Sequence, residues 1–477
     1  MSDRMRCRRW SASLIALGLI LASARAEAQA TTPEPAPAPT PPPAPEPPPT
    51  TDPATQQPAP APISGATPLT SAPAPVPPAP APSPPAAAPP TPPEPEPVHY
   101  PIVGPNRELR LSENVALRLG VQAQIWADSS QDPNREPDGG TGDHQNNFIL
   151  RRGRILAGAN LMKNMTLYVL LESSALGMAT GTTQGNNKNF SPPQILDAWG
   201  EVKFHDAFML EGGLMIVPVS RNHVMATTTY LSLDTGNTTA VTLGALQTSV
   251  LRDVGFQAKG QLFGDHFEYR LGVFSGIREA PHGTPQVEVG AQNSPRFSGY
   301  LQYNFLDPEK GYVFHGTYYG RKKVLGISSG FDLQKGSGLD PYYAVSGAAF
   351  TAIPLNGDAK AGGDEIASFV NYTYYDGQET ARTLNGQNDL LIEAAYFNKA
   401  SSLSVFGKFE GQFFGRDDTQ VANRIWYGGG LKYHLYENYC NFTLAFNHST
   451  FPNAPTSGDG AKNSTNQYTF AMQLYYF

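Results

Sequence analysis

The chain has 477 residues, with 34 Lys and Arg, 41 Asp and Glu, and a formal net charge of −7. It lacks the basic excess with which nucleic-acid-binding proteins neutralise phosphates, so we expect no nucleic-acid partner. Its two cysteines are Cys7, near the start, and Cys440. Because Cys7 falls in a segment that we expect to be removed, we predict no internal disulfide.

Residues 1–30 have the pattern of a secretory signal peptide. Four arginines precede an apolar run at 14–21, and Ala24-Arg25-Ala26 provides a small-residue cleavage site. The apolar run is shorter than the roughly 20 residues that a membrane-spanning helix needs. We therefore predict that this segment directs export and is cut off.

Residues 31–97 hold 30 of the chain's 45 prolines and contain no Lys, Arg, Trp, Tyr or Phe. Such a segment cannot bury a core and favours extended polyproline II structure. We predict a disordered periplasmic tether. It is either a spacer without a partner or a segment that contacts the cell wall or another envelope protein.

Residues 98–477 predict an all-β protein, a transmembrane antiparallel β-barrel. No segment here has 18 consecutive apolar residues, whereas apolar and polar residues alternate with period two. In 115–126, for example, Leu117, Leu119 and Val121 share one face and Arg118 and Gln122 share the other. The last strand ends on Phe477, and closure into a barrel leaves no unpaired sheet edge.

Connection lengths give the strand count, because outer-membrane barrels have short periplasmic turns and long outer loops. We predict sixteen strands, with eighteen as the alternative count. They lie at 115–126, 147–160, 165–173, 194–204, 208–217, 253–263, 266–275, 296–305, 323–334, 342–353, 365–375, 389–398, 403–414, 424–435, 440–448 and 467–477. Residues 312–319 also look like a strand, but counting them would place the long loop 376–388 in the periplasm. We therefore interpret 306–322 as a periplasmic connection with some extended structure of its own.

Five stretches resemble the phosphate-selective porin O/P family in their order and spacing. They are Phe148–Leu156, Ile195–Gly200, Leu214–Pro218, Leu251–Gly255 and Gly272–Gly276. The resemblance implies sixteen strands, a homotrimer and a third loop, 218–252, folded into the pore. The resemblance does not imply that this chain selects phosphate, because family members that bind phosphate use rows of Arg and Lys in the lumen. Here the barrel has 29 basic and 34 acidic residues, and the loop holds few charges.

The pore-lining candidates are basic residues on the polar strand faces, on the third loop and beside it. They are Arg118, Arg152, Arg154, Arg221, Arg252, Lys259 and Arg270. Arg151 falls on the opposite face, where an arginine at mid-membrane depth would cost about 2–4 kcal/mol, so we expect it at a headgroup or a subunit contact. The alternative is that these arginines pair with wall carboxylates such as Glu172 or Glu201 and only hold the barrel and loop together.

The sequence favours an outer-membrane porin that lets small ions or polar solutes diffuse passively, with a weak preference for anions. The alternative is a structural anchor that tethers the envelope through 31–97. We expect no enzyme, cofactor or metal, since no Cys/His spacing fits zinc. Gly326–Gly330 matches G-x-S-x-G, but it lies in an alternating strand rather than in a nucleophile elbow.

Overall fold

The structure is a computed structural model that describes most of the barrel and none of residues 1–108. The described residues are 109–131, 144–178, 188–190, 192–236, 251–277, 294–336, 339–358, 360–381, 384, 386–415, 423–451 and 464–477. The signal peptide and the tether predicted from the sequence lie outside them.

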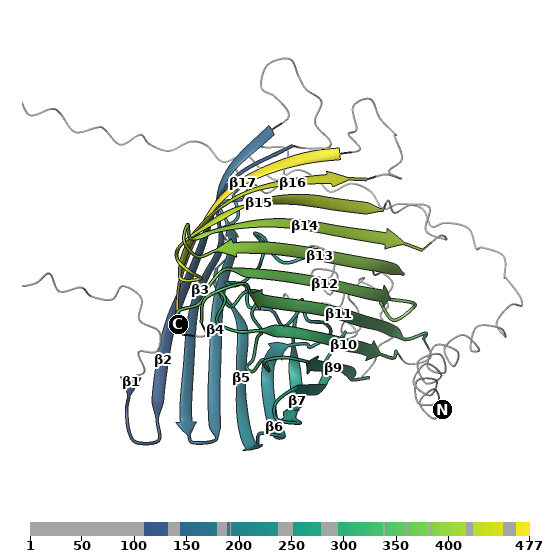
Figure 1. Cartoon of the computed structure of the whole chain (residues 1–477). Helices are drawn as coiled ribbons and strands as arrows, with labels where there is room; N and C mark the ends of the chain where they lie inside the picture. The colour runs from purple at the N-terminus through teal and green to yellow at the C-terminus, as the bar shows by residue number, and fades with distance from the viewer. Residues whose placement is uncertain are drawn as a thin grey trace, which may run out of the picture. The chain divides into compact units, whose positions relative to one another are not determined.

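Within the described residues, sixteen antiparallel strands form a closed barrel, and a two-residue strand pairs at its rim (Figure 1). The rim strand is β1 (Leu109–Arg110). The barrel strands are β2 (Ala116–Gln131), β3 (His144–Met162), β4 (Met165–Leu176), β5 (Gln194–His205), β6 (Phe208–Ile216), β7 (Arg252–Leu262), β8 (Phe267–Phe274), β9 (Arg296–Asn304), β10 (Val324–Gln334), β11 (Tyr342–Pro354), β12 (Glu365–Asp376), β13 (Gln387–Asn398), β14 (Leu403–Phe414), β15 (Arg424–Tyr436), β16 (Cys440–Thr450) and β17 (Ser464–Tyr476). The last strand closes on the first barrel strand, with Met472 opposite Ile125.

The structure confirms the count of sixteen barrel strands and excludes eighteen for the described chain. Strand β9 pairs directly with β10, and Asn304 lies opposite Gly326. The connection 305–323 therefore contributes no strand to the wall. The predicted strands agree with the observed ones to within a few residues, and the largest extension occurs at the loop end of β2.

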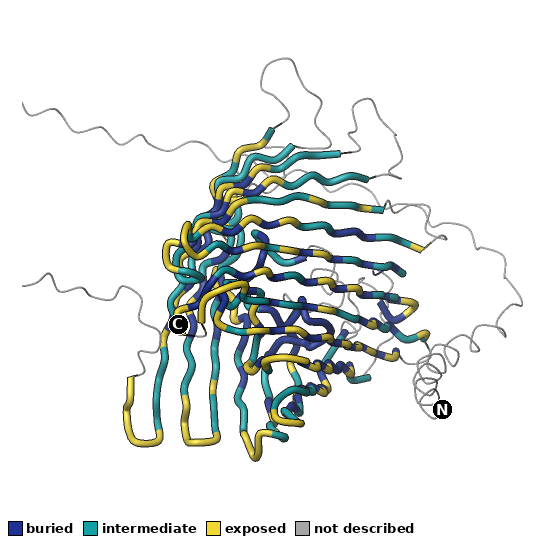
Figure 2. The backbone as a smooth tube through the Cα atoms, in the orientation of Figure 1, coloured by how far each residue is buried: buried dark blue, intermediate teal, exposed yellow. Residues whose placement is uncertain are grey.

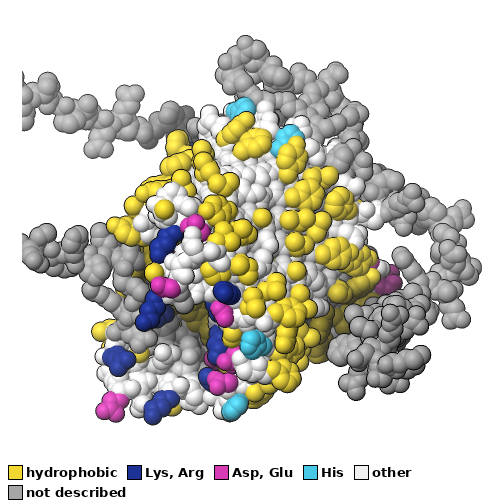
Figure 3. Space-filling view, viewed as in Figure 1, with side chains coloured by type: hydrophobic (Ala, Val, Ile, Leu, Met, Phe, Trp, Pro, Cys, Tyr) yellow, Lys and Arg dark blue, Asp and Glu magenta, His cyan; other side chains and the backbone are white. Residues whose placement is uncertain are grey.

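The barrel is apolar outside and polar inside, the reverse of a soluble protein. Along β2, Leu119 and Val121 point outward and are each 57% exposed, whereas Gln122 and Gln124 point inward and are buried. Figure 2 shows this alternation of exposed and buried positions along the strands, and Figure 3 shows apolar side chains over the outer wall. Only lipid covers such a wall favourably. The chain is therefore a multi-pass β-barrel of the bacterial outer membrane.

A β-bulge at Arg151 overturns one expectation. In the ladder with β2, Gln124 pairs with Arg152 and Ile125 pairs with Leu150, so Arg151 is an extra residue. A bulge shifts the phase of the alternation. Phe148 consequently faces outward and Ile149 inward, and Arg151 turns into the lumen instead of meeting lipid or another subunit. Strict period two cannot reveal an inserted residue, which is why the sequence analysis placed Arg151 wrongly.

The topology predicts which ends of the barrel antibodies can reach in intact cells. An epitope inserted between Gln378 and Glu379, which are exposed in the β12–β13 loop, should be detected without permeabilisation. The same epitope between Ala400 and Ser401, in the β13–β14 turn, should be detected only after permeabilisation. The reverse pattern would mean that 305–323 crosses the membrane after all.

Candidate functional site

The third outer loop is defined here as residues 217–251 between β6 and β7, and the part of it that the structure describes enters the lumen. Its described part, 217–236, reaches strands all around the barrel. The carbonyl of Val219 accepts a hydrogen bond from the Ser346 hydroxyl of β11 at 2.5 Å. Lys432 of β15 donates to the carbonyl of Tyr230 at 2.7 Å. Strand β15 lies on the far side of the barrel from β6, where the loop begins, so the loop can reach it only through the lumen, and the inward-folded third loop is confirmed.

One glycine makes room for the loop. A Cβ atom on Gly330 of β10 would lie 2.0 Å from the carbonyl oxygen of Val219, far inside contact distance. Any larger residue would therefore push the loop off the wall. This glycine ends the Gly326–Gly330 motif, whose small residues are accounted for by packing in a barrel strand.

A second segment, the β9–β10 connection 305–323, also enters the lumen and meets the third loop. Phe314 donates its N–H to the carbonyl of Val224 at 2.8 Å, and its own carbonyl accepts from Ala226 at 2.8 Å. Tyr312 donates its hydroxyl to Asp197 of β5 at 2.9 Å. The segment lies outside the wall, as predicted, but it also folds inward. The sequence did not predict this, because apolar residues look the same in a strand and in a buried loop.

Arg221, predicted as a pore-lining residue, is instead buried where these two segments meet. It forms two hydrogen bonds of 2.8 Å with the Glu309 carboxylate, and its guanidinium lies 3.4 Å from the centre of the Phe350 ring. Burial alone would lower the pKa of Arg221, but the charge of Glu309 raises it above the usual value. This pair joins the loop to the β9–β10 connection and is structural.

The structure brings three other candidates together on one side of the lumen. Arg152, Arg154 and Arg252 all lie within electrostatic reach of Glu172. Each has its own carboxylate: Arg152 binds Asp234 of the loop at 2.5 Å, Arg154 binds Glu172, and Arg252 binds Asp197 at 3.1 Å. The three arginines therefore converge, but with compensating negative charge.

The remaining candidates lie toward the periplasmic end. Lys259 bridges Glu211 and Glu201, the latter at 2.6 Å. Arg270 pairs with Glu268 at 2.7 Å and also donates to the carbonyl of Tyr312 at 2.7 Å. Arg118 lies at the rim, 5.3 Å from the centre of the Phe477 ring. Pairing with carboxylates, which the sequence left open as the alternative, is thus seen for Arg152, Arg154, Arg221, Arg252, Lys259 and Arg270.

Sequence reasoning missed Asp234 as the main anchor of the loop. Its carboxylate binds both Arg151 at 2.8 Å and Arg152 at 2.5 Å. Burial would raise the pKa of Asp234, but Arg152 and Arg151 hold it well below the usual value. The signal in the sequence was that Asp234 is the single acidic residue of the loop.

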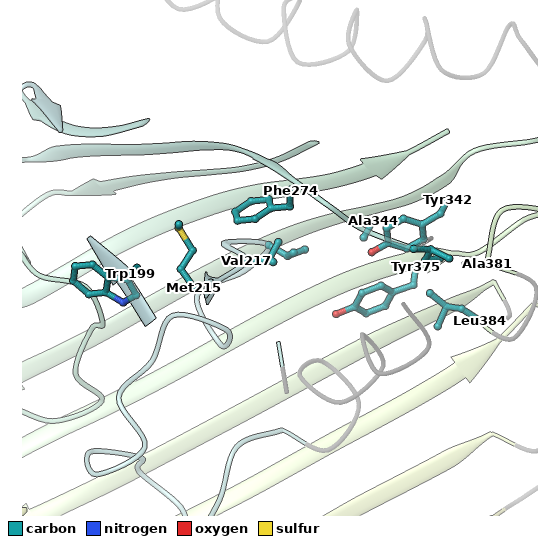
Figure 4. Packing of buried hydrophobic residues seen from close by; sticks show 11 residues of the cluster. Trp199, Met215, Val217, Phe274, Tyr342, Ala344, Tyr375, Ala381 and Leu384 are labelled. Atoms are coloured by element: carbon teal, nitrogen blue, oxygen red, sulfur yellow. The ribbon is translucent and has the colours of Figure 1, made fainter. Parts of the chain in front are cut away.

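An apolar cluster fills part of the lumen beside the loop (Figure 4). Trp199 and Met215 come from β5 and β6, whereas Tyr342 and Tyr375 come from β11 and β12. Val217 and Val219 of the loop lie in the same cluster. Packing of this kind narrows the lumen and fixes the point at which the loop leaves the wall.

Cavities remain at both ends of the barrel. The one at the outer end has a volume of about 650 Å³ and is lined by Trp126, Asp234 and Trp426 among others. The one at the periplasmic end has a volume of about 320 Å³ and is lined by Lys203, Tyr312 and neighbouring residues. The loop and its ion pairs lie between them.

The described residues contain no cluster of three potential metal ligands and no helix long and apolar enough to cross a membrane.

The fold is similar to those of solved outer-membrane proteins. An anion-selective porin from Comamonas acidovorans is 12% identical, with a TM-score of 0.48 over 76% of this chain and 100% of the porin. OmpT of Vibrio cholerae, in a trimer form, is 11% identical, with a TM-score of 0.45 over 76% and 100%. The channel DcaP of Acinetobacter baumannii is 9% identical, with a TM-score of 0.45 over 76% and 99%. No protein family and no curated protein matches the sequence, so the resemblance to the phosphate-selective O/P family is not confirmed.

Asp234 is the residue whose loss should loosen the loop most. Asp234→Asn would leave two arginines in the lumen without their anion, a change that costs about 3–5 kcal/mol for a buried pair. We expect a larger single-channel conductance and a lower melting temperature. Asp206→Asn is the matched control, because its pair with Lys203 is exposed. Equal behaviour of the two variants would show that Asp234 does not hold the loop.

The pKa of His223 predicts how the stability of loop docking changes as the pH falls. Burial lowers the pKa of His223 to about 3, and Arg296 and Arg252 act in the same direction. The undocked loop gains a proton below about pH 6.5, whereas the docked loop does not. Docking therefore weakens as pH falls from 6.5 toward 3, by at most about 1.4 kcal/mol per pH unit.

Melting temperatures at pH 7 and pH 4.5 test this expectation. The wild type should lose more stability over this interval than His223→Gln, which removes the titrating group. An identical loss in both proteins would mean that His223 is not the group that couples the loop to pH.

Proposed function

We propose that the protein is an outer-membrane channel through which small ions and polar solutes diffuse passively, with a weak preference for anions. The observation that carries this proposal is the polar lumen, closed on all sides by the barrel and narrowed by a loop of the chain itself. Side chains and dipoles at such a constriction bias which ions enter. Cavities at both ends give solutes access to it.

The preference is weak because the charges at the constriction nearly cancel. Arg152, Arg154 and Arg252 face Asp234, Glu172 and Asp197. A site that held phosphate tightly would instead direct several unpaired donors at one point. The paired arginines therefore support general anion preference over phosphate capture.

Two further parts of the proposal come from the sequence. Residues 1–30 direct export, and 31–97 form a periplasmic tether that acts as a spacer or contacts the cell wall. The resemblance to the phosphate-selective O/P family supports a homotrimer in the outer-membrane lipid. Ion conduction distinguishes the channel function from that of a structural anchor, because an anchor does not need to conduct ions.

Reversal potentials across a tenfold KCl gradient test the selectivity. The wild type should show weak anion preference. The triple variant Arg152→Gln, Arg154→Gln and Arg252→Gln removes the arginines from Glu172 and Asp197 and leaves Asp234 with Arg151 alone. It should therefore prefer cations, with conductance of the same order. Arg118→Gln, at the rim, is the matched control and should change little. A cation-selective wild type, or block by micromolar phosphate, would contradict the proposal.

A further inference from the structure

The outer cavity has the size and lining of a small-molecule site. Its volume of about 650 Å³ lies within the usual range for such sites. Its lining residues come from β2, β3, β14, β15, β16 and β17 and from the third loop, so it is part of the barrel's mouth rather than a surface groove. A solute that approaches from outside meets it before the constriction.

The cavity carries an excess of positive charge. Three cations line it, Arg151, Lys408 and Arg424, against one lining carboxylate, Asp234. Arg151 uses Nε and Nη2 to bind Asp234, which leaves Nη1 outside that contact. Lys408 donates to the carbonyl of Thr235 at 2.9 Å and pairs with the buried Glu410 carboxylate at 3.6 Å, which offsets its charge. Arg424 lies exposed on β15 and makes no ion pair with any other described residue.

The cavity also has aromatic walls. Trp126 from β2 and Trp426 from β15 both line it, together with Phe406. The guanidinium of Arg151 lies 5.4 Å from the centre of the Trp126 ring, which fixes a cation beside an indole face. Indole faces bind flat apolar rings, and arginine forks bind carboxylates in two parallel hydrogen bonds. Both features occur within one cavity.

We propose that this cavity binds small aromatic carboxylate anions and concentrates them above the constriction. The ring would lie against Trp126 or Trp426, and the carboxylate would accept hydrogen bonds from Arg151 and Arg424. This proposal rests on the channel function proposed above and names the class of solute that the channel favours. Inorganic phosphate would satisfy the cations but would leave the aromatic walls without a partner.

Intrinsic fluorescence measures binding directly. The chain has four tryptophans, and Trp10 lies in the predicted signal peptide. Of the other three, Trp126 and Trp426 line the outer cavity, whereas Trp199 lines the periplasmic one. Benzoate should change the emission of the purified barrel in detergent at millimolar concentration, and the change should persist in Trp199→Phe. Cyclohexanecarboxylate has the same charge without an aromatic ring and should bind about fivefold or more weakly.

Arg424→Gln should weaken benzoate binding by about five- to tenfold, the range of a charge-assisted hydrogen bond in a wet site. Arg321→Gln is the matched control, because Arg321 pairs with Glu437 at the periplasmic end and should leave binding unchanged. Equal affinity for benzoate and cyclohexanecarboxylate, or unchanged binding in Arg424→Gln, would overturn the proposal. Phosphate that competes with benzoate on equal terms would overturn it in favour of a general anion site.

Planar-bilayer recording separates this proposal from the proposed function. Benzoate should interrupt the KCl current of the wild type, and the interruptions should shorten in Arg424→Gln. A channel that conducts KCl without binding benzoate would refute the aromatic carboxylate site and leave the channel function intact. A barrel that binds benzoate but conducts no ions would refute the channel function.

Discussion

Ion pairs hold the third loop across the lumen. The position of the constriction and the pairing of most lumenal arginines depend on these ion pairs. Asp234 binds two arginines of β3, and Arg221 binds Glu309 of the β9–β10 connection. A charge in such a confined space is stable only when its partner is fixed nearby. If the loop left the wall, buried arginines would lose their carboxylate partners. The need to keep these pairs fixes the loop in the lumen and so determines where the lumen is narrow.

The same constraint explains why the arginines found in the sequence do not form an open anion path. Arg152, Arg154 and Arg252 converge, but each is bound to a carboxylate that also positions a segment of chain. A cation without an ion-pair partner among the described residues instead lies above the constriction, at Arg424. The charges that hold the loop are thus separate from the exposed arginine on which the proposed anion site depends.

Alternation and loop length were sufficient to predict the barrel, because a two-residue period and closure leave few choices of fold. The same rules failed at Arg151, where one inserted residue reversed the phase of the strand. They also could not show that 305–323 folds inward, since burial in a lumen and burial in a wall select the same residues. The sequence did not predict the role of Asp234, because the partners of a loop residue depend on how the loop crosses the barrel.

A covalent cross-link between the loop and the wall tests this account most directly. Gln122 Nε2 and Thr227 Oγ1 lie 3.4 Å apart. Because the Gln122 side chain spans most of the gap and cysteine is shorter, cysteines at these two positions, in a Cys440→Ser background, should be joined in the membrane by a short bifunctional thiol reagent. Because the loop is already docked there, the single-channel conductance should stay close to its value before cross-linking. A cross-link that does not form although both thiols react, or one that forms and changes the conductance severalfold, would contradict a loop that resides in the lumen.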